Sequence, residues 1–291
     1  MKLTTRIIPS ALFFCLLIPY AAKAEVSVGE LTYERSAQVG ETYQGVIFIR
    51  NRDEEPQEVK VYQTDYLFFF DGTNTYGEPG KAPRSNANWI TFSPKRLTIP
   101  PKEASGVNYT IKVPDNETLE GTYWSMLMVE GISKNSPEFS KPEKEEVKLY
   151  IREVVRYGVQ MVTHIGNTGT RSLKFVNTQF LKEAERKILQ MDIENIGERW
   201  LNPFLWTELY DEKGSYIGRF EDKRQRIYPG TSVRYKVDLS QVVQGQYKAL
   251  VVAEAGDDDV FGATYTLKIE EDKKPPEDTE KKISTASSEN Q

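Results

Sequence analysis

The stretch YWSMLMV, at residues 123–129, gathers aromatic, methionine and aliphatic residues around a single serine. A short run of this composition is typical of a β-strand that is buried within a sheet. Comparable runs precede it along the chain: GVIFI at 45–49, EVKVY at 58–62 and VNYTIKV at 107–113. Turn-forming sequences separate these runs, such as NRD at 51–53, DGTN at 71–74 and PDN at 114–116. Strands spaced about 8 to 15 residues apart predict an antiparallel β-sandwich.

The same pattern runs a second time in the C-terminal half of the chain. After GNTGT at 166–170, strand-like runs begin with LKFV at 173–176 and end with ATYTLKI at 263–269. Between them lie ILQMDI at 188–193, LWTELY at 205–210, VRYKV at 233–237 and YKALVV at 247–252, with a hairpin turn expected at DEKG, 211–214. Each half supplies about seven strands, and no stretch has the pattern of an amphipathic helix of ordinary length. We therefore expect an all-β fold of two tandem immunoglobulin-like β-sandwich domains, residues 25–166 and 167–270.

Residues 1–24 have the pattern of a signal peptide. Lys2 and Arg6 form a charged start, residues 11–18 are apolar, and AKA at 22–24 is a small-x-small cleavage site. The apolar run is well short of the roughly 20 residues that span a membrane, so we expect a periplasmic or otherwise exported protein without stable membrane insertion. Removal of this leader leaves 35 of the 38 basic residues against 43 acidic ones, a charge of −8. That balance argues against nucleic acid or anionic lipid as the main partner.

Two segments lack the apolar residues that a folded domain needs. Residues 133–144, SKNSPEFSKPEK, are polar and interrupted by proline, which predicts a long mobile loop. Residues 271–291 are charged and then rich in serine and threonine, which predicts a disordered tail.

Few residues have the chemistry of an active site. Cys15, the only cysteine, lies in the leader, so the mature chain has no disulfide and no cysteine nucleophile. His164 is the only histidine and is interpreted as a structural or surface residue, since no second imidazole exists for a metal pair. The run DDD at 257–259 has calcium-binding oxygens, but we interpret it as a solvated hairpin tip. The tryptophans lie in strand patterns, which favours core positions over stacking on a sugar or peptide: Trp89, Trp124, Trp200 and Trp206. The sequence predicts no enzyme, no cofactor and no metal.

The run at residues 147–165 is the most informative for function. Val147, Leu149 and Ile151 alternate with polar residues, and a second alternation follows after a shift of phase at 153–154 that indicates a bulge. Nineteen residues exceed the usual strand length of about 3 to 10. At a sheet edge, such a strand offers its backbone to another chain; in a sheet interior, it serves only its own core. Both interpretations stay open. In the first, the residues that bind the partner are Val155, Arg156, Tyr157, Val159 and Met161.

Three motifs resemble the first domain of PapD-like periplasmic pilus chaperones: NWITFSP at 88–94, LTIPPK at 97–102 and YWSMLMV at 123–129. In that family a strand with a tryptophan leads to a proline, then to a corner of leucine and proline, then to a strand of aromatic and aliphatic residues. The opening strand with its asparagine turn, 45–51, and the long loop and final strand within 133–165 fit the same order. The resemblance covers residues 26–165 by motif and the second domain by architecture. The same pattern is similar to the first domain of bacterial surface proteins that interact with WxL proteins.

The chaperone resemblance implies a non-catalytic protein that binds an exported subunit by lending it a strand. Two basic residues in the cleft between the domains would hold the C-terminal carboxylate of the subunit, and Arg156 matches the family's lysine in the final strand. The family's arginine in the first strand is not matched, because residues 26–33 contain none and Arg35 lies past the expected place. The alternative function is a structural or adhesion accessory of the cell envelope that binds a surface protein or a glycan.

Overall fold

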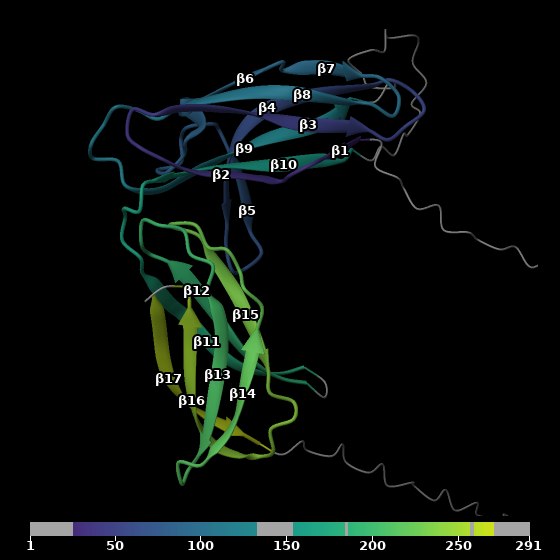
Figure 1. Cartoon of the computed structure of the whole chain (residues 1–291). Helices are drawn as coiled ribbons and strands as arrows, with labels where there is room; N and C mark the ends of the chain where they lie inside the picture. Colours follow the sequence, from purple (N-terminus) through teal and green to yellow (C-terminus); the bar gives the residue numbers. More distant parts are fainter. Residues whose placement is uncertain (1–25, 133–153, 184–185, 257–258, 271–291) are drawn as a thin grey trace, which may run out of the picture.

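The computed structural model describes residues 26–132, 154–183, 186–256 and 259–270, which form two β-sandwiches joined end to end (Figure 1). The predicted leader at 1–24, the predicted loop at 133–144 and the predicted tail at 271–291 lie outside these residues. Two tandem immunoglobulin-like sandwiches were expected from the spacing of the strands, and this fold class is confirmed. Strand β10 ends at Ile165, and strand β11 begins at Leu173. The exact domain limits at residues 25, 166 and 270 stay a prediction.

The first sandwich consists of two sheets. One has the strand order β1-β3-β8-β6, and the other has the order β2-β10-β9-β4-β5, with β7 also paired to β4. The elements are β1 (Val26–Val28), β2 (Thr32–Ala37), β3 (Thr42–Asn51), β4 (Gln57–Phe68), β5 (Asn74–Gly77), η1 (Ala87–Trp89), β6 (Ile90–Ser93), β7 (Arg96–Ile99), β8 (Ala104–Lys112), β9 (Gly121–Ile132) and β10 (Arg156–Ile165). Alternate residues of β3, β8, β9 and β10 fill the space between the sheets, as the period of two in the sequence predicts.

The first two strands of the chain belong to opposite sheets of the first sandwich. Strand β1 pairs antiparallel with β3, and after a short crossing β2 pairs parallel with β10 in the opposite sheet. Gly29 donates its N–H to the carbonyl of Phe48 before the chain crosses. The opening segment therefore holds the two sheets together at one side of the sandwich.

The second sandwich packs the sheet β11-β12-β15 on the sheet β14-β13-β16-β17. Its strands are β11 (Leu173–Glu183), β12 (Arg186–Asn195), β13 (Phe204–Asp211), β14 (Tyr216–Asp222), β15 (Ser232–Asp238), β16 (Gly245–Glu254) and β17 (Val260–Ile269). Its core contains the aliphatic residues predicted from the sequence and, fully buried, Tyr235. The predicted hairpin at 211–214 is confirmed, since Gly214 donates to the carbonyl of Asp211 between β13 and β14.

Each sandwich has a buried asparagine at the end of one strand, and the two asparagines make equivalent hydrogen bonds. The side-chain amide of Asn51, at the end of β3, donates to the carbonyls of Glu55 and Ile99, and its Oδ1 accepts from the N–H of Asp53. Asn195, at the end of β12, repeats this arrangement with the partners Arg199, Ile227 and Gly197. Because each amide satisfies backbone groups from two chain segments, it fixes where the strand ends and how the next loop leaves.

The junction between the sandwiches is closely packed. Trp124 of β9 stacks on Tyr228, which lies between β14 and β15, with ring centroids 4.8 Å apart and an interplanar angle of 13°. The β4–β5 hairpin extends from the first sandwich toward the second (Figure 1), and Phe70 at its tip donates its N–H to Ser232 Oγ. At Gly121 (φ +74°) an added Cβ would collide with the backbone of Glu198, so the two sandwiches approach backbone to backbone.

Candidate functional site

Strand β10 is interior over part of its length and an edge over the rest. It pairs with β9 along all ten residues, from Arg156 opposite Glu130 to Ile165 opposite Gly121. Strand β2 pairs only with residues 160–165 of β10. Within the described part of the chain, no strand covers the other side of residues 156–159, so each of the two interpretations from the sequence describes one half of the strand. We call this side of residues 156–159 the open edge.

The open edge carries backbone groups that point away from the sheet. Gln160 donates its N–H to the carbonyl of Leu31, at 2.8 Å, on the side where β2 lies. Backbone groups in a strand alternate in direction, so the N–H and C=O of Gly158 and of Arg156 point to the same side as those of Gln160. The open edge thus presents two donors and two acceptors in line with the start of β2.

The five residues predicted to bind a partner lie in three different environments. Val155 precedes the strand and is 40% exposed, and the side chain of Arg156 is 57% exposed. Tyr157 is half-buried against the core and donates its hydroxyl to the carbonyl of Val26. Val159 and Met161 are fully buried in the first core, and their backbone groups point toward β9, so neither residue offers a group to a partner at the open edge. Of the nineteen-residue run, residues 156–165 form a strand in the structure, and residues 147–153 lie outside the described residues.

Arg156 lies over a buried carboxylate. Its Nε donates to Glu130 at 2.8 Å, and the same carboxylate accepts from Lys60 and from the Tyr62 hydroxyl, each at 3.1 Å. Burial would raise the pKa of Glu130, but the hydrogen bonds from Lys60 and Tyr62 and the two cationic charges lower it below its ordinary value. Glu130 therefore stays ionised and holds Arg156 in place beside the open edge.

A hollow of about 490 Å³ lies next to Arg156 on the outward face of the first sandwich. We call it the methionine hollow, since Met126 and Met128 of β9 belong to its floor. Tyr66 and Tyr76, whose rings lie 5.2 Å apart, line it from the β4–β5 hairpin. Its complete lining is Tyr62, Thr64, Tyr66, Tyr76, Met126, Met128, Arg156, Gly158 and Gln160.

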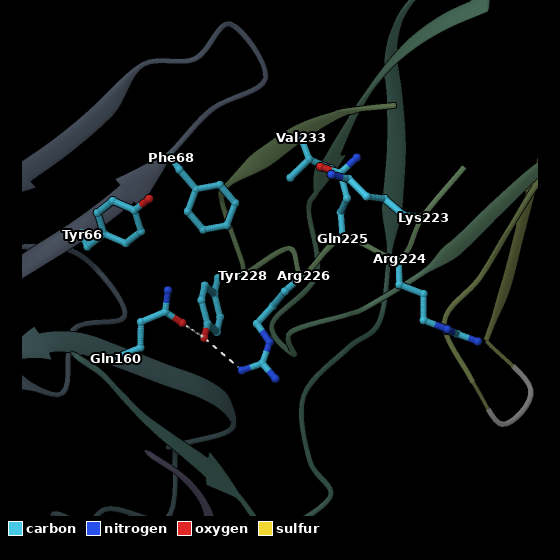
Figure 2. Close-up of a pocket in the computed structure, with 9 residues that line it drawn as sticks. All are labelled: Tyr66, Phe68, Gln160, Lys223, Arg224, Gln225, Arg226, Tyr228 and Val233. Atoms are coloured by element: carbon cyan, nitrogen blue, oxygen red, sulfur yellow. Dashed lines mark hydrogen bonds between the residues drawn. The ribbon is translucent and has the colours of Figure 1, made fainter. Parts of the chain in front are cut away.

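A second cavity, of about 470 Å³, lies between the two sandwiches (Figure 2). Gln160 of β10 accepts a hydrogen bond of 2.8 Å from the Tyr228 hydroxyl, which in turn accepts one from Arg226 at 3.3 Å. Burial raises the pKa of Tyr228 to about 12, so its hydroxyl keeps its proton at neutral pH. The cations that line this cavity come from the second sandwich (Lys223, Arg224 and Arg226), whereas Arg156, which the chaperone resemblance placed in the cleft, lines the methionine hollow instead.

The chain is similar to fimbrial chaperones over most of its length. A chain of the chaperone–tip adhesin complex of CFA/I fimbriae biogenesis is 11% identical with a TM-score of 0.46, and the match covers 84% of this chain and 98% of that one. The class 5 fimbriae chaperone CfaA is 11% identical with a TM-score of 0.43, covering 84% and 99%. A chain of the CsuC–CsuE chaperone–tip adhesion subunit complex from Acinetobacter baumannii is 12% identical with a TM-score of 0.44, covering 82% and 98%. No family profile and no curated protein sequence matches the chain.

The one imidazole of the chain is engaged at both ring nitrogens. His164 Nδ1 lies 2.9 Å from Thr122 Oγ1, Nε2 lies 2.7 Å from Glu34 Oε1, and the side chain is 6% exposed. Its ring stacks on Trp200 of the second sandwich, with centroids 5.7 Å apart. This agrees with the interpretation of His164 as a structural residue at the domain junction.

Neither a metal-binding cluster nor a membrane-spanning helix is found in the part of the chain that the structure describes. The described residues contain no cluster of three or more histidine, cysteine, aspartate or glutamate side chains arranged to hold a metal ion. Of the run at 257–259, only Asp259 is described, and its carboxylate pairs with Arg171 at 2.9 Å. Among the same residues, no helix has the length and apolar character of a membrane span.

Several residues of the two cavities were not singled out by the sequence. Gln160, Met126 and Met128 lie on the outward faces of strands whose inward faces fill the core, and alternation alone does not say which face is which. Tyr228 lies outside the strand-like runs of the sequence, and the sequence favours a core position for Trp124. The structure places both in the junction between the sandwiches, because Trp124 lies on the opposite face of β9 from Leu127.

Proposed function

We propose that this is an exported, non-catalytic polypeptide-binding protein that pairs a strand of its partner with the open edge of β10, as pilus-assembly chaperones do. One observation supports the proposal: residues 156–159 are paired on one side only, and the backbone groups of Arg156 and Gly158 point outward. An extended segment from another chain can continue the line of β2 there and form main-chain hydrogen bonds.

The backbone alone gives weak binding. Four main-chain groups at about 1 kcal/mol each contribute about 4 kcal/mol, so the backbone alone cannot give a dissociation constant tighter than about 1 mM once the entropy cost of association is included. A useful affinity therefore requires side-chain contacts on either face of the added strand. Arg156 offers one such contact, since its exposed guanidinium is fixed by Glu130 and is suited to a carboxylate of the partner.

The partner that this site suits is an exported protein subunit, the class implied by the sequence motifs. The partner is captured by the tagged, full-length protein from an envelope extract, and its affinity for purified variants is then measured. Arg156→Pro and Arg156→Ala form a matched pair, because both lose the guanidinium and only proline loses the outward N–H. Proline is tolerated at the first residue of a strand, so the fold should persist in both variants.

We expect Arg156→Pro to abolish capture and Arg156→Ala to weaken it. Equal binding by the two variants, with both shown to be folded by circular dichroism, would place the interaction elsewhere and favour the envelope-accessory function. The same measurement with peptides from the partner's C-terminus, free and amidated, tests the carboxylate contact. Arg156→Ala should weaken the free-acid peptide more than the amide.

A further inference from the structure

We infer that the methionine hollow receives an aromatic side chain from the strand that pairs with the open edge. The inference rests on the proposed function, because the hollow borders that edge through Arg156 and Gly158. It assigns a preference to the partner: an aromatic residue at the position opposite Gly158.

Gly158 determines what the partner meets at the edge. It lies in an extended strand with no positive φ, so the backbone conformation does not require glycine. A Cβ added at this position would collide with the Sδ of Met126 and would lie 3.1 Å from its Cε. The thioether of Met126 therefore lies across the backbone of Gly158 toward the open edge. It occupies the space that the Cβ of any other residue at position 158 would fill.

A residue paired with Gly158 on an added strand points its side chain to the same face of the sheet. There it meets the Met126 thioether first and the Met128 side chain behind it, since Gly158 is opposite Met128 and Gln160 is opposite Met126. Sulfur–aromatic contacts contribute about 0.3 to 1.5 kcal/mol each, and the flexible methionine chain adapts to the ring. An aromatic residue beside a strand glycine also covers the backbone that the glycine exposes.

The rest of the hollow favours a ring over a cationic group. Tyr62 of β4 lies opposite Met128, so Gly158, Met128 and Tyr62 form a row across three neighbouring strands. Tyr66 and Tyr76 form an aromatic wall on the β4–β5 hairpin. Glu130, the carboxylate that pairs with Arg156, already accepts from Arg156, Lys60 and Tyr62, so it offers little to a cationic side chain. An aromatic ring is thus the occupant that suits the floor and walls together.

The test uses a display library of random peptides selected on the full-length protein, and then Gly158→Val. Selected peptides should share one aligned position that is phenylalanine, tyrosine or tryptophan. Valine at 158 displaces the Met126 thioether, so it should weaken these peptides about tenfold, equivalent to about 1.4 kcal/mol, while their alanine-substituted forms bind as before. Gly262→Val in β17 is the control, because its added Cβ meets only the Val251 carbonyl in the second sandwich.

Each outcome decides the inference. Selected peptides without a shared aromatic position, or equal weakening of aromatic and alanine peptides by Gly158→Val, would overturn it. Strand pairing itself would still stand if Arg156→Pro abolished binding of those peptides and Arg156→Ala did not. Failure of the protein to select any peptide would overturn the proposed function as well. Should Gly158→Val not fold, Met126→Gln keeps the shape of the floor, removes its apolar character and must erase the aromatic preference.

Discussion

At the junction of the two sandwiches, the carboxylate of Glu34 contacts two side chains that belong to different sandwiches. It lies 2.7 Å from His164 Nε2 of the first and 2.9 Å from Arg226 Nη1 of the second. Trp200 lies between these partners, since its ring stacks on His164 and the Arg226 guanidinium lies 4.2 Å from its centroid. A single side chain of β2 therefore connects an imidazole and a guanidinium on either side of an indole.

The junction should lose stability in acid through Glu34. The hydrogen bond from His164, and after it the charge of Arg226, lower the pKa of Glu34 below its ordinary value of 4.5, against the effect of burial. A carboxyl whose pKa is lowered by folding stabilises the fold above its ordinary pKa, and this contribution is lost as the pH falls through the lowered value. In denaturant titrations followed by tryptophan fluorescence, stability should be steady from pH 7 to about pH 5 and then decline. Glu34→Gln should lose about 1 kcal/mol at pH 7 and show a shallower decline.

Glu130→Gln is the companion variant, because its carboxyl also has a lowered pKa but lies in the first sandwich. It should flatten part of the same acid decline without affecting contacts between the sandwiches. An unchanged acid decline in Glu34→Gln would show that Glu34 is not the group that titrates.

At the scale of single elements, the buried asparagine corners are the features most sensitive to substitution. Asn51 and Asn195 are 1% and 0% exposed, and each bonds backbone groups on more than one segment. We expect Asn51→Ala and Asn195→Ala each to lower the free energy of unfolding by about 1 to 3 kcal/mol, since buried carbonyls lose their donors. Asn116→Ala is the control, because Asn116 closes an exposed turn with Thr118 and should change stability by less than about 0.5 kcal/mol. Equal losses in all three variants, measured by urea unfolding, would contradict a special role for the corners.

The elements that the sequence predicted are those with a buried face. Strands β3 and β8 alternate apolar and polar residues around a core, β9 is a nearly continuous apolar run that is buried on both faces, and their positions were expected from these patterns. Strand β5 (NTYG) is exposed at all four residues, so no apolar alternation marked it. The division of the first strand into β1 and β2 depends on which sheets are nearby, which local pattern does not encode. For the same reason, the sequence pointed to β10 as the strand of interest but also assigned Val159 and Met161, which face the core, to the partner.

At the scale of the whole molecule, the sandwiches are joined by contacts of several kinds. A small apolar cluster of Trp124, Val162 and Tyr228 is flanked by Leu67 and Phe68 of the β4 strand. Arg84 pairs with Glu198 at 3.3 Å, and Thr122 donates its N–H to the Glu198 carbonyl. Domains that share so many contacts are expected to unfold together rather than as independent units.

Tyr228 is the residue that tests this coupling. Tyr228→Ala removes the stack on Trp124 and leaves a cavity, so calorimetry should resolve two transitions where the wild type has one, with a loss of about 3 kcal/mol. Tyr228→Phe keeps the stack and loses only the hydroxyl bonds to Gln160 and Arg226, so a single transition should remain, lowered by about 1 kcal/mol. Two transitions in the wild type would mean that the junction does not couple the sandwiches.

The parallel pairing of β2 with β10 also determines how the first sandwich responds to mechanical force. The two strands run side by side over six residue pairs, from Thr32 opposite Gln160 to Ala37 opposite Ile165. Tension between the start of β2 and the end of β10 slides the strands along each other, so their hydrogen bonds bear the load together. A hairpin such as β13–β14, pulled at its two open ends, instead unzips one bond at a time. In single-molecule pulling we expect a higher rupture force along the first path than along the second. Under traction along the chain, β10 would therefore keep its place in the sheet, and its open edge would stay available to a partner.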